Sequence, residues 1–144
     1  IQGGEGYLIT SDGRRYNYHD GQLTPEPTQK YEYQGTFELQ PQHDPHRSFY
    51  GKAFVERWTA NHHTRLALTS YGTTVATITP TDTDTYRIDI AMQYLSATTL
   101  RHVKEFLAQT DDTFKGITLP WLRKAVKDRQ QVEGAGKTYT LNEL

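Results

Sequence analysis

The chain has 144 residues, of which 35% are hydrophobic and 23% are charged, and it carries a formal net charge of -1 and no cysteine. This length suits one ordinary domain with its own core, so we expect residues 1–144 to form a single domain. The composition excludes disulfides, thiolate chemistry and cysteine-ligated zinc, and the near-neutral charge gives no bulk electrostatic argument for a polyanionic partner.

The N-terminal segment predicts a β-hairpin. Apolar and polar residues alternate through 7–9 and again through 16–18, and the turn-forming residues 11–13 separate the two runs. The next stretch contains Pro25 and Pro27, whose fixed φ and missing N–H donors disfavour regular structure. We therefore expect a loop or connector there.

The centre of the chain predicts a series of short strands. The first is broken near Gly35, where a bulge or turn is expected, and the proline-containing residues 40–47 predict a loop. Residues 80–84 predict a polar link before the clearest alternating run of the chain. The expected strand segments are 31–39, 49–55, 66–69, 75–78 and 86–92.

Two helices are predicted in the second half of the chain. Ser96 is a typical N-cap residue, and apolar residues recur at helical spacing through 97–109. A second helix is expected over 119–131, with Pro120 in its first turn and the glycines of 134–136 ending it.

The order of these elements indicates the fold class. Runs of strands followed by two helices predict an α+β domain with a mostly antiparallel sheet and both helices packed on it. Tyr139 and Leu141 are spaced to add a closing strand.

Three sequence blocks carry a resemblance to a known family. They are Ser48–Ala53, Ser70–Ala76 and Tyr94–Leu107, in this order within about sixty residues. Together they resemble an uncharacterised domain family encoded by phages and mobile elements of Gram-positive bacteria such as lactobacilli and streptococci. The resemblance implies a strand-rich core over 48–107 that leads into one helix, flanked by an N-terminal extension and a C-terminal segment (1–47 and 108–144), and it implies no activity.

The start of the first helix allows two interpretations. Ser96, helped by Thr98 or Thr99, is typical of a capped helix start. Alternatively, the free amides together with Thr98, Thr99, Arg101 and His102 could receive a phosphate or another anion.

A second candidate surface combines basic and aromatic residues. The basic residues of the second predicted helix usually form a solvated face. Alternatively, they could contact phosphates together with the N-terminal hairpin, whose aromatic rings could stack on bases. The residues are Arg14, Arg15, Tyr16, Tyr18, Arg123, Lys124, Lys127 and Arg129.

The signals for a metal are weak. His43, Asp44 and His46 lie close in sequence, and His62 is adjacent to His63, but a metal site needs three or four convergent ligands. We predict no metal and no cofactor.

The signals for catalysis are also weak. Ser70 lies in a turn without a Gly-x-Ser-x-Gly elbow, and residues 134–138 lack the first glycine of a phosphate-binding loop. We therefore predict no enzyme.

The preferred hypothesis is a non-catalytic binding module of phage or mobile-element origin that acts on a host protein or on nucleic acid, as an accessory or anti-defence factor. One alternative is a nucleic-acid-binding domain that uses the basic second helix, and another is a small hydrolase, suggested by the histidines and acidic residues. No run is long and apolar enough to span a membrane, so we expect a cytoplasmic protein in the host cell with no membrane partner. A homodimer is a further expectation, because a sheet of this kind must protect its edges.

Overall fold

The computed structural model describes residues 5–9, 11, 15–19, 22–25 and 30–144. It divides into two compact units, Ile1–Lys30 and Tyr31–Leu144. The expectation that residues 1–144 form one domain stays a prediction. None of the helices in the described residues has the length and apolar character that a membrane span requires.

The described part of the first unit is a three-stranded antiparallel sheet with the order β1-β2-β3. The strands are β1 (Glu5–Ile9), β2 (Arg15–His19) and β3 (Gln22–Pro25). The first two confirm the strands of the predicted hairpin. The third corrects the loop expected around Pro25, because β3 is an edge strand and edge strands tolerate a residue that cannot donate to the ladder.

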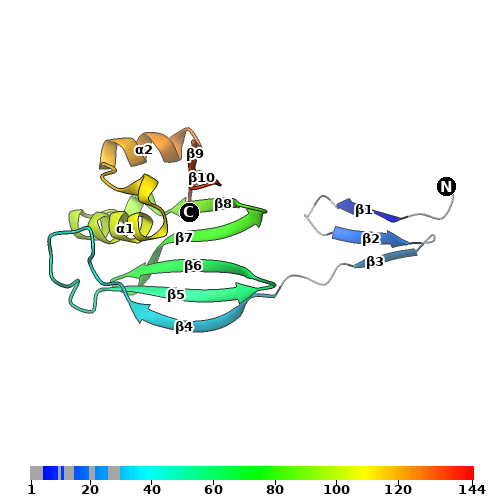
Figure 1. The fold of residues 1–144 in the computed structure, drawn as a ribbon, viewed down its shortest axis with the longest axis horizontal. Helices are drawn as coiled ribbons and strands as arrows, with labels where there is room; N and C mark the ends of the chain where they lie inside the picture. The colour runs from blue at the N-terminus through cyan, green and yellow to red at the C-terminus, as the bar shows by residue number, and fades with distance from the viewer. Residues whose placement is uncertain (1–4, 10, 12–14, 20–21, 26–29) are drawn as a thin grey trace. The chain divides into compact units, whose positions relative to one another are not determined.

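The second unit contains a seven-stranded sheet with the order β4-β5-β6-β7-β8-β10-β9 among the described residues (Figure 1). Its neighbouring strands are antiparallel, apart from β8 and β10, which are parallel. With two helices, this sheet confirms the predicted α+β class. The strands are β4 (Glu32–Glu38), β5 (Ala53–Ala60), β6 (His63–Ser70), β7 (Thr73–Asp82), β8 (Thr85–Ile90), β9 (Gln131–Gly134) and β10 (Lys137–Glu143).

Local backbone geometry explains how the strands connect. Tyr71 and Gly72 both have positive φ, as a two-residue hairpin turn requires, and they join β6 to β7. Gly35 has φ of 130°, and the β4–β5 pairing shifts between Tyr33 and Gly35, which confirms the predicted break. β7 continues through Pro80, which corrects the link predicted over 80–84, because a shift in the β7–β8 pairing between Pro80 and Asp82 accommodates the proline.

Both helices begin at the predicted residues and end differently. The α-helices are α1 (Ala97–Thr110) and α2 (Leu119–Lys127), and the short 3-10 helices are η1 (Met92–Tyr94) and η2 (Asp112–Phe114). The Ser96 side chain accepts a hydrogen bond from Thr99 N at 3.2 Å, as predicted. α2 ends before the predicted residue 131, because residues 131–134 pair with β10 and the glycines of 134–136 belong to that hairpin.

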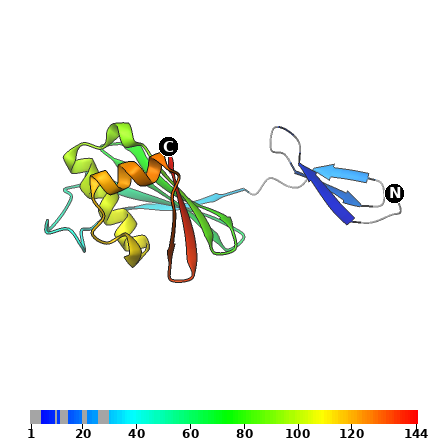
Figure 2. The same ribbon diagram turned by 90° about the horizontal axis from the view of Figure 1, so that it is seen from above.

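The core lies between one face of the sheet and the helices. α1 packs on β6, and α2 packs on β10, beside the C-terminal end of that strand (Figure 2). Alternate residues of the paired strands face this core. They include Val55, Leu68, Ile78, Ile88 and Leu141, and the helices contribute Val103, Phe106, Leu107, Leu122 and Ala125.

Candidate functional site

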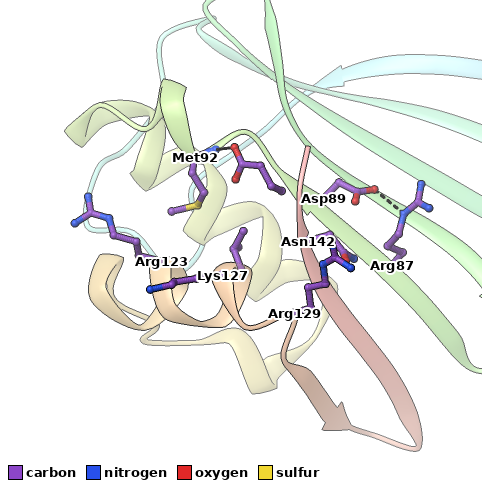
Figure 3. A pocket seen from close by; sticks show the side chains of 9 residues that line it. Arg87, Asp89, Met92, Arg123, Lys127, Arg129 and Asn142 are labelled. Carbon is purple, nitrogen blue, oxygen red and sulfur yellow. Dashed lines mark hydrogen bonds and ion pairs between the residues drawn. The ribbon is translucent and has the colours of Figure 1, made fainter.

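A cavity of about 560 Å³ opens between α2 and the strands β8 and β10 (Figure 3). Its lining includes the basic side chains of Arg87, Arg123, Lys127 and Arg129. Residues far apart in the sequence therefore contribute cations to one hollow.

The helix supplies these cations from its exposed face, next to Val126, which also lines the cavity. Leu122 and Val126 are buried, whereas Arg123 and Lys127, four residues apart, share an exposed face. Arg129 follows the helix end with φ of 48°, a left-handed backbone conformation that is uncommon outside glycine. This turn brings a third basic side chain of the segment to the cavity.

The strand side of the cavity is organised by an ion pair. Arg87 and Asp89 are two residues apart on β8, so they share one face of the sheet. Arg87 Nε donates to Asp89 Oδ2 at 2.9 Å, and Thr77 Oγ1 donates to the same oxygen at 3.3 Å. The Asp89 charge is thus paired, while the Arg87 side chain stays 54% exposed.

The charge balance of the cavity favours an anion. Two carboxylates, of Asp89 and Glu143, line it beside the four cations, and Glu143 Oε1 accepts a hydrogen bond from Met92 N at 3.2 Å. Among the described residues, the α2 side chains that line the cavity have no ion-pair partner. A hollow with excess positive charge raises the local concentration of anionic ligands.

The predicted basic and aromatic surface is only partly brought together. Arg123, Lys127 and Arg129 line the cavity, whereas Lys124 forms an ion pair with Asp128 at 3.0 Å. The remaining four predicted residues belong to the first unit: Arg14 lies outside the described residues, and Arg15, Tyr16 and Tyr18 lie in β2.

Sequence reasoning missed the contribution of Arg87 to this cavity. The sequence predicts that Arg87 and Asp89 lie on the same face of one strand. The position of Arg87 near α2, however, depends on the pairing of β10 with β8.

The predicted anion site at the start of α1 has a different arrangement. Thr98 and Arg101 are exposed, and Arg101 Nη1 donates to His46 Nε2 at 2.9 Å. Thr99 and His102 are buried instead. The four residues therefore point to two sides of the helix, and an anion contact here stays a prediction.

The buried side of α1 makes a polar cluster with the sheet. Ser70 Oγ lies 2.7 Å from His102 Nδ1 and 3.0 Å from Thr99 Oγ1. Burial lowers the pKa of His102, while the nearby Asp44 charge acts in the opposite direction. Ser70 is 3% exposed and His102 is 1% exposed, so this arrangement fits helix packing better than contact with a substrate.

The loop at residues 40–47 is tied to α1 by one buried carboxylate. Glu105 Oε1 accepts from the amides of Gln42, His43 and Asp44 at 2.6–2.9 Å, and Oε2 contacts His43 Nδ1 at 2.8 Å. Burial acts to raise the pKa of Glu105, but the hydrogen bonds from His43, Gln109 and Asp44 outweigh it and lower the pKa to about 2.

Two of the histidines that suggested a metal, His43 and His46, have other partners at this loop. His43 contacts Glu105, and His46 Nδ1 lies 2.6 Å from Asp44 Oδ1. In the part of the chain that the structure describes, no three His, Asp or Glu side chains come together as metal ligands.

Comparison with known proteins gives one family match. Residues 37–124 match the sequence model of a family described as a family of unknown function (DUF8033). No curated protein and no solved structure matches the chain. The matched range contains Arg87 and Arg123 of the cavity, and Lys127 and Arg129 follow it.

Proposed function

We propose that this chain, which belongs to the DUF8033 family of unknown function, is a non-catalytic module that binds nucleic acid through phosphates held in the basic cavity. The cavity is the observation that carries this proposal. Arginine guanidinium groups present several donors in a fixed geometry that suits phosphate oxygens. Phosphate contacts of this kind supply most of the sequence-independent affinity of nucleic-acid-binding proteins.

The remaining parts of the functional hypothesis rest on the sequence. The family match covers residues 37–124 and thus includes the three blocks on which the resemblance rests. An origin in phages or mobile elements of Gram-positive bacteria, a host protein as partner, an accessory or anti-defence role, a homodimer and a cytoplasmic location stay predictions.

The test measures binding of a fluorescein-labelled single-stranded oligothymidylate by anisotropy between about 50 and 200 mM salt. We expect the logarithm of the binding constant to fall linearly with that of the salt concentration, with a slope of about -0.7 for each phosphate contact. Substitution of both Arg123 and Lys127 by Gln should weaken binding and flatten this slope.

Lys124→Gln provides the matched control for Lys127→Gln alone. It removes one positive charge from the same helix, but Lys124 is paired with Asp128 and is not among the residues lining the cavity. It should leave the affinity nearly unchanged. Binding that ignores salt, or that falls equally in both variants, would contradict a phosphate site in the cavity.

A hydrolase is a second candidate because Ser70 Oγ contacts His102 Nδ1. The burial of both groups favours a structural role. We expect no labelling of the protein by a fluorophosphonate probe, and labelling that disappears in Ser70→Ala would support the hydrolase instead.

A further inference from the structure

One row of paired side chains begins at the β4 edge of the sheet. Tyr33 stands opposite Trp58, and Trp58 stands opposite Arg65. Ser70, five residues after Arg65 on β6, contacts α1 through its side chain. Because successive residues of a strand alternate between faces, Arg65 and its paired neighbours lie on the face opposite α1.

The same row continues to the basic cavity. Leu66 pairs with Ile78, so the next position in register places Arg65 beside Thr79. Thr79 in turn pairs with Arg87, which lines the cavity. Three strand spacings separate β5 from β8, or about 14 Å. The row therefore runs from two aromatic rings at one end to Arg87, the strand arginine of the cavity, at the other.

The aromatic end of the row is accessible and held in place. Tyr33 is 53% exposed, and its ring centroid lies 5.0 Å from that of Trp58 at an interplanar angle of 60°. The Tyr33 hydroxyl is hydrogen-bonded to Thr36 Oγ1, which restrains the ring. Trp58 Nε1 is buried and has no hydrogen-bond partner among the described residues.

The charges along the row suit a phosphate backbone. Arg65 lies between the rings and the cavity and forms no ion pair with another described residue. Carboxylates of this face flank the row: Glu56 pairs with Ala67 and Asp89 is bound to Arg87 in the adjacent row, while Glu38 pairs with Phe54 and Glu133 with Thr138 in other rows. The row itself thus presents rings and cations without a carboxylate.

We infer that this row, Tyr33, Trp58, Arg65, Thr79 and Arg87, is the binding track of a single-stranded nucleic acid, with bases stacked on the rings and phosphates directed to Arg65 and the cavity. The inference rests on the proposed function and specifies its substrate class. Stacking on protein rings needs the flat faces of bases, which a duplex keeps stacked on one another.

The experiment compares three labelled probes on the full chain: oligothymidylate, an abasic strand of the same length, and a duplex. Tyr33→Leu and Trp58→Leu should each weaken oligothymidylate binding by at least about fivefold, since loss of a stacked ring costs this much or more. Tyr33→Phe and Trp58→Phe keep a ring and should bind nearly as the parent does. Thermal melting of each variant checks that it is folded.

A spectroscopic readout separates stacking from a loss of fold. The chain has two tryptophans, so Trp121→Phe leaves Trp58 as the sole indole reporter. Oligothymidylate should quench its fluorescence, and the abasic strand should not.

The outcomes distinguish the inference from the proposed function. Equal binding of base-bearing and abasic strands, with no effect of the leucine variants, overturns the track and leaves the phosphate site standing. If the leucine variants lose oligothymidylate binding while the Arg123 and Lys127 double variant binds as the parent does, the phosphate site is overturned instead. Tighter binding of the duplex, or binding of none of the three probes, overturns the track.

Discussion

Arg129 lines the cavity but has a backbone conformation that lowers the stability of the folded protein. It occupies a left-handed backbone position directly after α2, where glycine is the usual residue. For a residue with a Cβ atom this conformation costs about 1–2 kcal/mol. The same turn brings the guanidinium to the cavity. Strain kept at a ligand-facing position is typical of functional sites.

Arg129→Gly should therefore stabilise the protein and weaken nucleic-acid binding. Relief of the strain, reduced by the greater freedom of glycine in the unfolded chain, should raise the free energy of unfolding by about 0.5–1 kcal/mol. Urea denaturation and anisotropy measure the two effects. Arg129→Gln keeps the strained backbone and should lose affinity without gaining stability. A destabilised glycine variant would contradict the strain argument.

Glu105 predicts how stability depends on acid. Its folded pKa of about 2 lies below the ordinary 4.5, so its contribution is fully present above pH 4.5 and is lost as the pH falls toward 2. Glu105→Gln should lower the free energy of unfolding at neutral pH by about 2 kcal/mol, because the amide cannot accept all the bonds of the carboxylate. It should also flatten the loss of stability in acid.

Urea denaturation across this pH range provides the measurement for Glu105. Glu133→Gln, the same chemical change on an exposed side chain of β9, should leave the profile unaltered. If the parent and Glu105→Gln lose stability equally in acid, the hydrogen bonds between Glu105 and the loop at residues 40–47 contribute little to the free energy of unfolding.

At the scale of single elements, helix starts depend on local chemistry. Ser96 and Thr118 each accept a hydrogen bond from the amide three residues further on. Such caps can be predicted from sequence because both partners lie within one turn. The cap of α1 was predicted in this way.

Removal of the α1 cap gives a direct test. Ser96→Ala should lower the free energy of unfolding by about 1 kcal/mol, because the amide of Thr99 loses its acceptor. Ser96→Asp keeps an acceptor and adds a favourable charge at the helix start, so it should retain the stability of the parent. Thermal and urea melts measure both. An alanine variant as stable as the parent would mean that water replaces the cap at no cost.

Strand ends were harder to predict than helix starts because they depend on partners elsewhere. Residues 22–25 and 131–134 carry loop-like or helix-ending residues, yet each becomes a strand through pairing with a neighbour. The cavity shows the same limit. The basic face of α2 could be predicted from helical spacing, whereas the contribution of Arg87 required the β8–β10 pairing, which no local pattern encodes.

At the scale of the whole molecule, the family boundary and the folding boundary differ. The family match ends at residue 124, inside α2, and β10 lies beyond it. β10 nevertheless lies within the sheet, between β8 and β9, and contributes the buried Tyr139 and Leu141 to the core. The segment that matches the family therefore cannot complete this sheet by itself.

A fragment of residues 31–144 should fold cooperatively, and a fragment of residues 31–124 should not. The shorter one loses four buried side chains, those of Ala125, Val126, Tyr139 and Leu141, and the ladder of β8 with β10. The two larger ones, Tyr139 and Leu141, contribute about 1.5–3 kcal/mol each. This loss is comparable with the total stability of an ordinary domain, about 5–15 kcal/mol. Urea unfolding followed by circular dichroism distinguishes the fragments. Equal denaturation midpoints would contradict the assignment of β10 to the core.

The parallel pairing of β8 with β10 also affects how the protein is made. The ribosome must add residues 91–136 after it finishes β8 and before it begins β10, which takes roughly 2–10 seconds at typical elongation rates. During this interval β8 exposes an unpaired edge that other nascent chains can join. A holding chaperone that covers this edge should therefore improve the yield of recombinant protein.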